Sequence, residues 1–115
     1  MGVDTASESA KDPGLELDED GHLLNADAWS EDCAQVLAAN DGLKLTDDHW
    51  WLIRFVRQHY QRYGMPPLML IVIRQLREQP GHADASSRTL YRLLPDGPIR
   101  LACRYAGLPK PESCI

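Results

Sequence analysis

The sequence predicts a mainly α-helical protein: a small orthogonal bundle of about five helices with an N-terminal β-hairpin and a flexible C-terminal arm. Hydrophobic residues recur at spacings of three and four along most of the chain after residue 30. Capping residues, glycines and prolines divide this pattern into short helices. An Asp-Gly turn between two apolar runs precedes the first helix. With 115 residues, of which 43% are hydrophobic and 25% charged, the chain can form a single core.

We expect three parts along the chain. Residues 1–14 are small and polar, and we interpret them as a disordered leader. Residues 15–107 form the hairpin plus helical-bundle domain, and residues 108–115 the flexible arm that carries a cysteine. Within the stretch LELDEDGHLL, the Asp20-Gly21 pair is a strong hairpin signal. Because an isolated hairpin is marginally stable, we expect this one to lie against the helices.

Two helices are predicted after the hairpin. Ser30 is the expected N-cap of the first helix, which Asn40-Asp41-Gly42 ends. Thr46 is the expected N-cap of the second helix, which ends at Gly64. Apolar and aromatic residues of the second helix share one face, and we interpret them as core residues rather than as a ligand site. They are Trp50, Ile53, Val56, Tyr60 and Tyr63.

Three more helices are predicted in the second half of the chain. Pro66-Pro67 opens the third, where LMLIVI also fits a buried strand, but the helix formers of RQLREQ favour a helix. Ser86 or Ser87 caps a short fourth helix. The last helix begins at Pro98 and ends at Gly107. We expect one side of it to face the core: Ile99, Ala102 and Cys103.

The composition argues against several classes of protein. The longest apolar run, residues 68–73, is much shorter than the roughly 20 residues of a membrane span, and no secretory signal is present, so we expect a cytoplasmic protein. No C-x-x-C or His-x-x-x-His pair occurs, so we expect no metal. Because Gly-rich phosphate loops are absent from the sequence, we also expect no cofactor.

Two cysteines near the C-terminus remain as candidates for chemistry. Cys103 lies near the end of the last predicted helix, and Cys114 follows eleven residues later. The connection spans roughly 35 Å when extended. Folded back at the glycine, it can bring the two sulfurs into bonding distance at a cost of roughly 3 kcal/mol in chain entropy. Four residues set its geometry: Gly107, Pro109, Lys110 and Pro111.

The surroundings of Cys114 in the sequence do not predict an activated thiol. Glu112 and the C-terminal carboxylate oppose ionisation, whereas Lys110 favours it. We therefore expect a carrier that its partner activates, acting as a co-substrate rather than as an autonomous enzyme. The residues alone also allow Cys103 to be a core residue and Cys114 to have no role. Cys33, in a helical pattern, is interpreted as a small buried apolar residue.

The C-terminal sequence AGLPKPESCI resembles the arm of the DsrC/TusE family, sulfur carriers once described as a gamma subunit of dissimilatory sulfite reductase. DEDGHLLNADAW resembles the hairpin of the family, LTDDHWWLIRFVRQHYQRYGMPP its central helix, and SSRTLYRLLPDGP its approach to the arm. The resemblance covers residues 15–115. It implies that Cys114 receives sulfur as a persulfide. It also implies that Cys103, the second arm cysteine of DsrC-type members, forms a disulfide or trisulfide with Cys114.

The resemblance also implies partners. A DsrC-like chain serves dissimilatory sulfite reduction or sulfur oxidation, with dissimilatory sulfite reductase or related sulfurtransferases of the TusBCD/DsrEFH or TusA kind. A membrane-associated reductase complex then reopens the disulfide or trisulfide. The alternative within the family is a TusE-like sulfur relay for tRNA 2-thiouridine synthesis, which needs only Cys114.

A helix-turn-helix DNA-binding regulator is the alternative from another class. The helices around residues 64–66 would place Arg74, Arg77 and Arg88 on phosphates. Residues 1–32 hold ten Asp and Glu against one Lys, whereas the rest of the chain holds eleven Lys and Arg against seven Asp and Glu. Because of this acidic front and a pI near 5.2, we do not expect DNA as a partner.

Overall fold

The computed structural model describes residues 16–111, so the predicted leader and the end of the arm with Cys114 lie outside the described residues. Within this range the chain is mainly helical, as predicted. A short 3-10 helix, η1 (Ala26–Ala28), precedes five α-helices. These are α2 (Glu31–Asn40), α3 (Asp47–Tyr63), α4 (Met69–Arg77), α5 (Ser87–Leu93) and α6 (Pro98–Tyr105).

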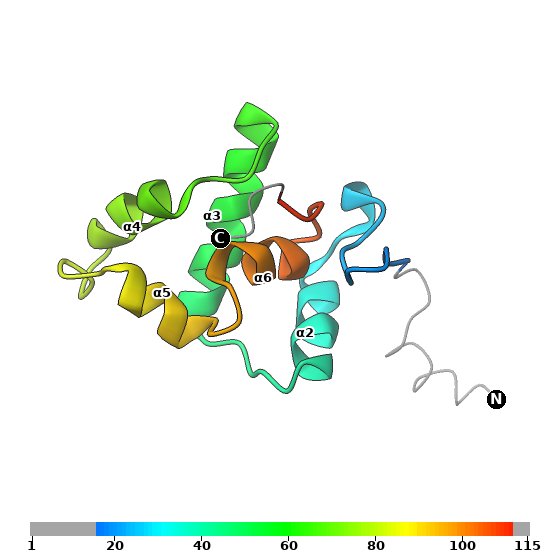
Figure 1. Ribbon diagram of the computed structural model, residues 1–115, viewed down its shortest axis with the longest axis horizontal. Helices are drawn as coiled ribbons and strands as arrows, with labels where there is room; N and C mark the ends of the chain where they lie inside the picture. Colours follow the sequence, from blue (N-terminus) through cyan, green and yellow to red (C-terminus); the bar gives the residue numbers. More distant parts are fainter. Residues whose placement is uncertain (1–15, 112–115) are drawn as a thin grey trace.

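Helix α6 lies at the centre of the bundle. It packs against α3 and α2 and also contacts α5, while α4 and α5 pack against each other. The helix axes cross one another instead of running side by side (Figure 1). No helix within residues 16–111 is long and apolar enough to cross a membrane. The last helix is thus the element on which α2, α3 and α5 converge, and it leads directly into the arm.

The helix boundaries follow from local capping. Ser30 and Ser86 cap α2 and α5 with their side chains, as predicted. The start of α3 is a capping box in which the Nδ1 atom of buried His49 accepts a hydrogen bond from the backbone N–H of Thr46 at 3.0 Å. The Nε2 atom of the same ring donates to the carbonyl of Leu93 at 2.8 Å. His49 therefore joins the start of α3 to the end of α5.

The predicted apolar face of α3 is only partly in the core. Ile53 and Val56 are buried, Trp50 and Tyr60 are half-buried, and Tyr63 is exposed because the last turn of α3 extends beyond the other helices. On α6 the prediction is confirmed, since the side expected to face the core is buried: Ile99, Ala102 and Cys103.

The predicted N-terminal β-hairpin is wrong. The turn is present, but within residues 16–111 its arms pair only through an isolated antiparallel bridge between Leu17 and Leu23, and no strand forms. The Asp18 carboxylate accepts hydrogen bonds from two backbone N–H groups of the turn. Directly after the bridge, the side chain of Asn25 caps η1 and ends the extended backbone. Side-chain capping on both sides therefore prevents the pairing from growing.

Three further expectations need adjustment. LMLIVI is helical, but Pro66-Pro67 lies before α4, whose N-cap is Leu68. Cys33 is half-buried rather than buried. Leu108 and Pro111 are buried, so the packed body includes part of the segment that we assigned to the arm.

Candidate functional site: the root of the arm

Cys103 lies in the last turn of α6, and its side chain has no exposed surface. Burial raises the pKa of the Cys103 thiol to about 12. At neutral pH the group is therefore protonated, and it is also shielded from any reagent. In this conformation the Cys103 thiol is therefore unreactive.

The chain reverses direction directly after α6. Gly107 has a φ of +74°. The backbone N–H of Leu108 donates to the carbonyl of Cys103 at 2.9 Å, and the backbone N–H of Gly107 donates to the carbonyl of Arg104 at 3.2 Å. This pair of hydrogen bonds is the Schellman motif. A Cβ on Gly107 would lie only 2.6 Å from Cδ1 of Trp29. The reversal therefore has a backbone conformation and a space that suit glycine alone.

Two side chains hold the end of α6 from outside the helix. Trp29 donates a hydrogen bond from Nε1 to the carbonyl of Tyr105 at 2.7 Å. Arg57 of α3 donates from Nη1 to the carbonyl of Ala106, also at 2.7 Å. The Arg57 guanidinium lies over the Trp29 indole, 4.3 Å from its centroid. The stacked side chains of Trp29 and Arg57 thus satisfy two carbonyls that the end of the helix leaves without a backbone donor.

A third contact comes from the N-terminal turn. Buried His22 donates from Nδ1 to the carbonyl of Leu108 at 3.0 Å, and a carbonyl only accepts, so the ring proton is on Nδ1. The Nε2 atom has no hydrogen-bond partner in the described part of the chain. Burial lowers the pKa of His22, so the ring is neutral at pH 7. Lys110 and Asp20 add an exposed ion pair at 3.6 Å.

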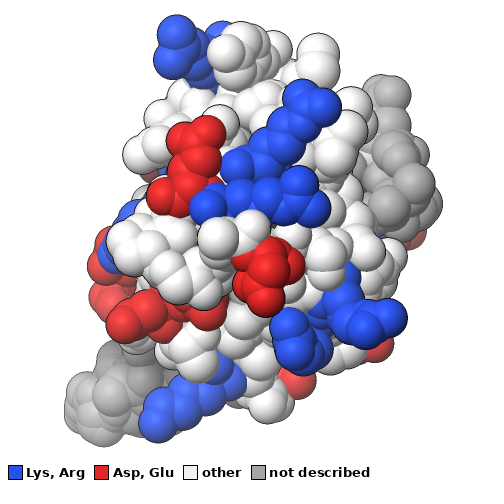
Figure 2. Space-filling model, turned by 90° about the vertical axis from the view of Figure 1, so that its left-hand side faces the viewer, with Lys and Arg blue, Asp and Glu red and all other residues white. Residues whose placement is uncertain are grey.

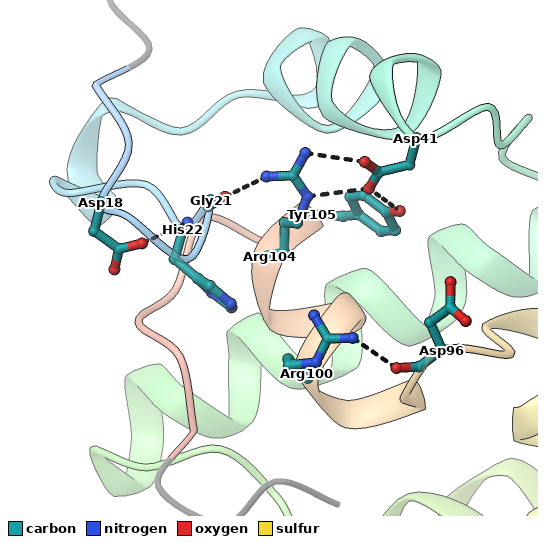
Figure 3. Close-up of polar contacts among 8 residues, drawn as sticks. All are labelled: Asp18, Gly21, His22, Asp41, Asp96, Arg100, Arg104 and Tyr105. Carbon is teal, nitrogen blue, oxygen red and sulfur yellow. Dashed lines mark hydrogen bonds and ion pairs between the residues drawn. The ribbon is translucent and has the colours of Figure 1, made fainter.

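Arg104 links the same turn to the end of α2, and Figure 3 shows its guanidinium between the two. Its Nη1 donates to the carbonyl of Gly21, and its Nε and Nη2 donate to the Asp41 carboxylate at 3.1 and 3.2 Å. The hydroxyl of Tyr105 donates to the same carboxylate at 2.6 Å. Partial burial alone raises the pKa of Asp41, but the bonds from Arg104 and Tyr105 outweigh it and lower the pKa. Asp41 is therefore an anion that joins α2 to α6.

The arm root, defined as residues 103–111, is thus fixed on several sides before the chain reaches Cys114. Residues 9–115, which include the arm root, match the family model described as DsrC like protein. The chain belongs to the DsrC-like family.

The chain is similar both to sulfurtransferases and to DsrC proteins of known structure. It is 42% identical over 101 residues to Sulfurtransferase TusE of Yersinia pseudotuberculosis serotype I, which covers 88% of this chain and 94% of the relative. Among solved structures, DsrC of Allochromatium vinosum is 39% identical with a TM-score of 0.75, covering 86% of this chain and 88% of that one. The oxidized gamma-subunit of the dissimilatory sulfite reductase from Archaeoglobus fulgidus is 34% identical with a TM-score of 0.77, covering 88% and 92%.

The structure brings together some of the residues that the sequence singled out. Cys103 and Gly107 share the end of α6, exposed Lys110 follows, and Pro111 is buried against the bundle. Cys114 lies outside the described residues, so its role stays a prediction. Sequence reasoning missed the side chains that hold the arm root, because they lie 49 to 86 positions from their partners in the chain. They are His22, Trp29 and Arg57.

Replacing Gly107 with alanine tests the reversal. Gly42 is a matched control, because its φ of +75° is similar but nothing lies within 4 Å of an added Cβ. We expect Gly42→Ala to lower the free energy of unfolding by about 1 kcal/mol. Gly107→Ala should lower it by about 3 kcal/mol, since the collision with Trp29 adds to the strain. Urea denaturation measures both, and equal losses would contradict the packing at Trp29.

The pH dependence of stability tests His22. Because its pKa is lowered in the folded chain, its contribution to stability is complete above the unfolded pKa of 6.5 and is lost as the pH falls below it. Between pH 7.5 and 5.5, His22→Asn should lose less stability than the wild-type chain. His82→Asn is the control, because hydrogen bonding with the Pro80 carbonyl and with Asp48 raises the pKa of His82. In that variant acidification should cost more than in the wild type.

Alkylation tests the state of Cys103. Because Cys103 is fully buried and burial raises its pKa to about 12, we expect iodoacetamide at pH 8 to modify it far more slowly in the folded chain than in urea. Half-buried Cys33 is the internal control and should differ less between the two conditions. Peptide mass spectrometry measures both rates. Rapid labelling of Cys103 under native conditions would contradict the buried site.

Proposed function

We propose that this chain is a sulfur carrier in which Cys114 holds sulfur as a persulfide and Cys103 is the internal thiol that can close onto it. The carrier role is supported by family membership and by relatives named as sulfurtransferase TusE and as a sulfite reductase gamma-subunit. The observation that carries the two-cysteine form is the position of Cys103 at the end of α6, next to the reversal at Gly107 and eleven residues before Cys114.

In the loading step, the Cys114 thiolate attacks the outer sulfur of a partner persulfide. The new bond is Cys114–S, and the S–S bond of the partner breaks, so that its electron pair leaves on the partner thiolate. The transferred sulfur keeps its proton, and charge and oxidation state balance. This step needs a partner that supplies the persulfide and favours the thiolate form of Cys114.

In the closing step, Cys103 must first be uncovered. Leu108 follows the reversal and is hydrogen-bonded to the backbone of Cys103, so the arm root has to open there. Once the thiol reaches water its pKa falls towards the usual value, and the thiolate can attack the inner sulfur of the Cys114 persulfide. A Cys103–Cys114 disulfide forms and hydrosulfide leaves. The sulfane sulfur is reduced as the two thiols are oxidised, so no external oxidant is required.

A trisulfide places one sulfur between the same two cysteines. Sulfite is the oxidant in this step: at a sulfite reductase partner, sulfite and the two thiols take up two electrons and four protons, two S–S bonds form, and the three sulfite oxygens leave as water. Reopening to two thiols and sulfide then takes four electrons and four protons from an external reductase. We propose that dissimilatory sulfite reductase or a related sulfurtransferase loads the chain, that a membrane-associated reductase complex reopens it, and that loading takes place in the cytoplasm.

A TusE-like relay for tRNA 2-thiouridine synthesis is the second candidate. It uses Cys114 alone, and Cys103 is then a core residue. Two observations favour it: the complete burial of Cys103 and the 42% identity to sulfurtransferase TusE. The two candidates share the loading step and differ in whether the arm root opens.

The DNA-binding alternative has little support. Arg77 donates a hydrogen bond from Nε to the carbonyl of Ala85 at 2.8 Å, so part of its guanidinium is engaged within the bundle. On the face of the molecule that carries α4 and α5, acidic and uncharged groups separate the basic side chains (Figure 2). Recognition of a phosphate backbone favours a continuous basic surface. We do not propose this function.

Intact mass after treatment with inorganic polysulfide tests the cysteine roles. The wild-type chain should gain one sulfur and then lose it as hydrosulfide, leaving a Cys103–Cys114 disulfide. Cys103→Ser should keep the added sulfur, and Cys114→Ser should gain none at the arm. Addition mapped to Cys33 instead would contradict the site. A Cys103→Ser variant with full activity towards a partner would reject the trisulfide and favour the TusE-like relay.

A further inference from the structure

Large exposed apolar side chains concentrate at the corner between α3 and α4. Tyr63 and Met65 are each 58% exposed, Leu68 is 67% exposed and Leu70 55%. These four fall within eight consecutive residues. Contiguous apolar surface of this kind is uncommon on a protein that does not use it for binding.

Two hollows meet at this corner and share Met65, Pro66 and Leu68. The first, of about 730 Å³, extends along α3 as far as Phe55. The second, of about 640 Å³, is lined on its other side by Ile99 and by residues 109–111 of the arm. Together they form one apolar groove, the corner groove, that runs from α3 to the arm.

The corner groove is lined by the arm residues that lead to Cys114, the proposed site of sulfur exchange. Pro111 is buried and lines the groove. Cys114 follows three residues later and, even with a fully extended backbone, can lie only about 10 Å away. A partner that exchanges sulfur with Cys114 must bring its own sulfur to within about 2 Å of the Cys114 sulfur. As long as Pro111 stays in place, the reacting sulfur of such a partner therefore lies within about 12 Å of the arm end of the corner groove, close enough for the partner surface to contact it.

The charges around the groove indicate what kind of surface fits it. Its lining includes Arg62 and Lys110, and no Asp or Glu lines either hollow. The chain as a whole has a net charge of −5, so this basic and apolar region differs from the rest of the protein. Charge complementarity favours carboxylates on the partner.

We propose that the corner groove is the docking surface for the protein that exchanges sulfur with Cys114, and that this partner presents an apolar ridge flanked by carboxylates. The inference rests on the proposed carrier function and adds to it a site of recognition that is separate from the reacting thiol. Docking here holds the partner while the last four residues of the arm deliver the sulfur.

Leu68→Asp tests the groove without weakening the fold. Leu68 is the N-cap of α4, a position where aspartate is preferred, so the variant should fold at least as well as the wild type. The change removes an apolar contact and places a carboxylate where the partner is acidic. Leu24→Asp is the matched control, since Leu24 is 63% exposed and lines neither hollow.

Sulfur transfer to Cys114 is measured by intact mass from two protein sources and one inorganic source. The protein sources are the persulfide-loaded TusBCD complex of Escherichia coli and the dissimilatory sulfite reductase of Archaeoglobus fulgidus turning over sulfite. The inorganic source is polysulfide. We expect Leu68→Asp to lower the rate constant for protein-to-protein transfer about tenfold, as for loss of a central interface residue. Polysulfide loading should stay within about twofold of the wild type, because the reacting thiol is unchanged.

Several outcomes would overturn the docking proposal. They are wild-type transfer by Leu68→Asp, an equal loss in Leu24→Asp, and no transfer from either protein source to the wild-type chain. A wild-type dimer in analytical ultracentrifugation that Leu68→Asp dissociates would assign the groove to a second copy of the chain and also overturn it. Normal polysulfide loading of Cys114 in those cases would leave the carrier function standing, whereas its absence would remove both.

Discussion

A helix that ends inside a domain leaves carbonyl oxygens that need donors, and this requirement organises the protein around the end of α6. Donors to the carbonyls of Tyr105 and Ala106 come from the segment before α2 and the middle of α3, and the N-terminal turn donates to Leu108 just beyond the helix. Each of them also fixes the direction in which the chain leaves the helix. The hydrogen bonds that satisfy the end of α6 therefore also set the direction of the chain that follows the helix. Because Gly107 fits against Trp29 without a side chain, the arm root can lie close enough for all of them.

Cys103 has two requirements that conflict. As part of the core it contributes packing and stays protonated, whereas reaction with Cys114 needs a thiolate in contact with water. In the proposed closing step, opening of the arm root at Leu108 would separate these requirements in time, since the thiol stays buried until then. The bonds at the arm root set the cost of that opening. Because several hydrogen bonds hold residues 103–111, the arrangement with Cys103 buried is the stable one. In the proposed opening, water molecules would replace these hydrogen bonds when a partner binds the arm.

In the proposed docking arrangement, the arm delivers the sulfur and the corner groove recognises the partner. An apolar groove with basic margins has the surface to select a partner. Placing the groove where the arm leaves the body keeps the reacting sulfur within reach of whatever binds there. In this arrangement, exchanging one partner for another changes the groove and leaves the sulfur chemistry unchanged.

The sequence by itself determined the features that depend on neighbouring residues. Ser30, Thr46 and Ser86 begin helices because their side chains satisfy the nearest N–H groups, and Gly107 ends α6 because it accepts a positive φ. The spacing of Cys103 and Cys114 is likewise a property of the chain. Only the tertiary structure decided that His22, Trp29 and Arg57 hold the arm root and that Cys103 is buried away from water. These depend on groups up to 86 positions apart, whose meeting is set by packing of the whole bundle rather than by local preference.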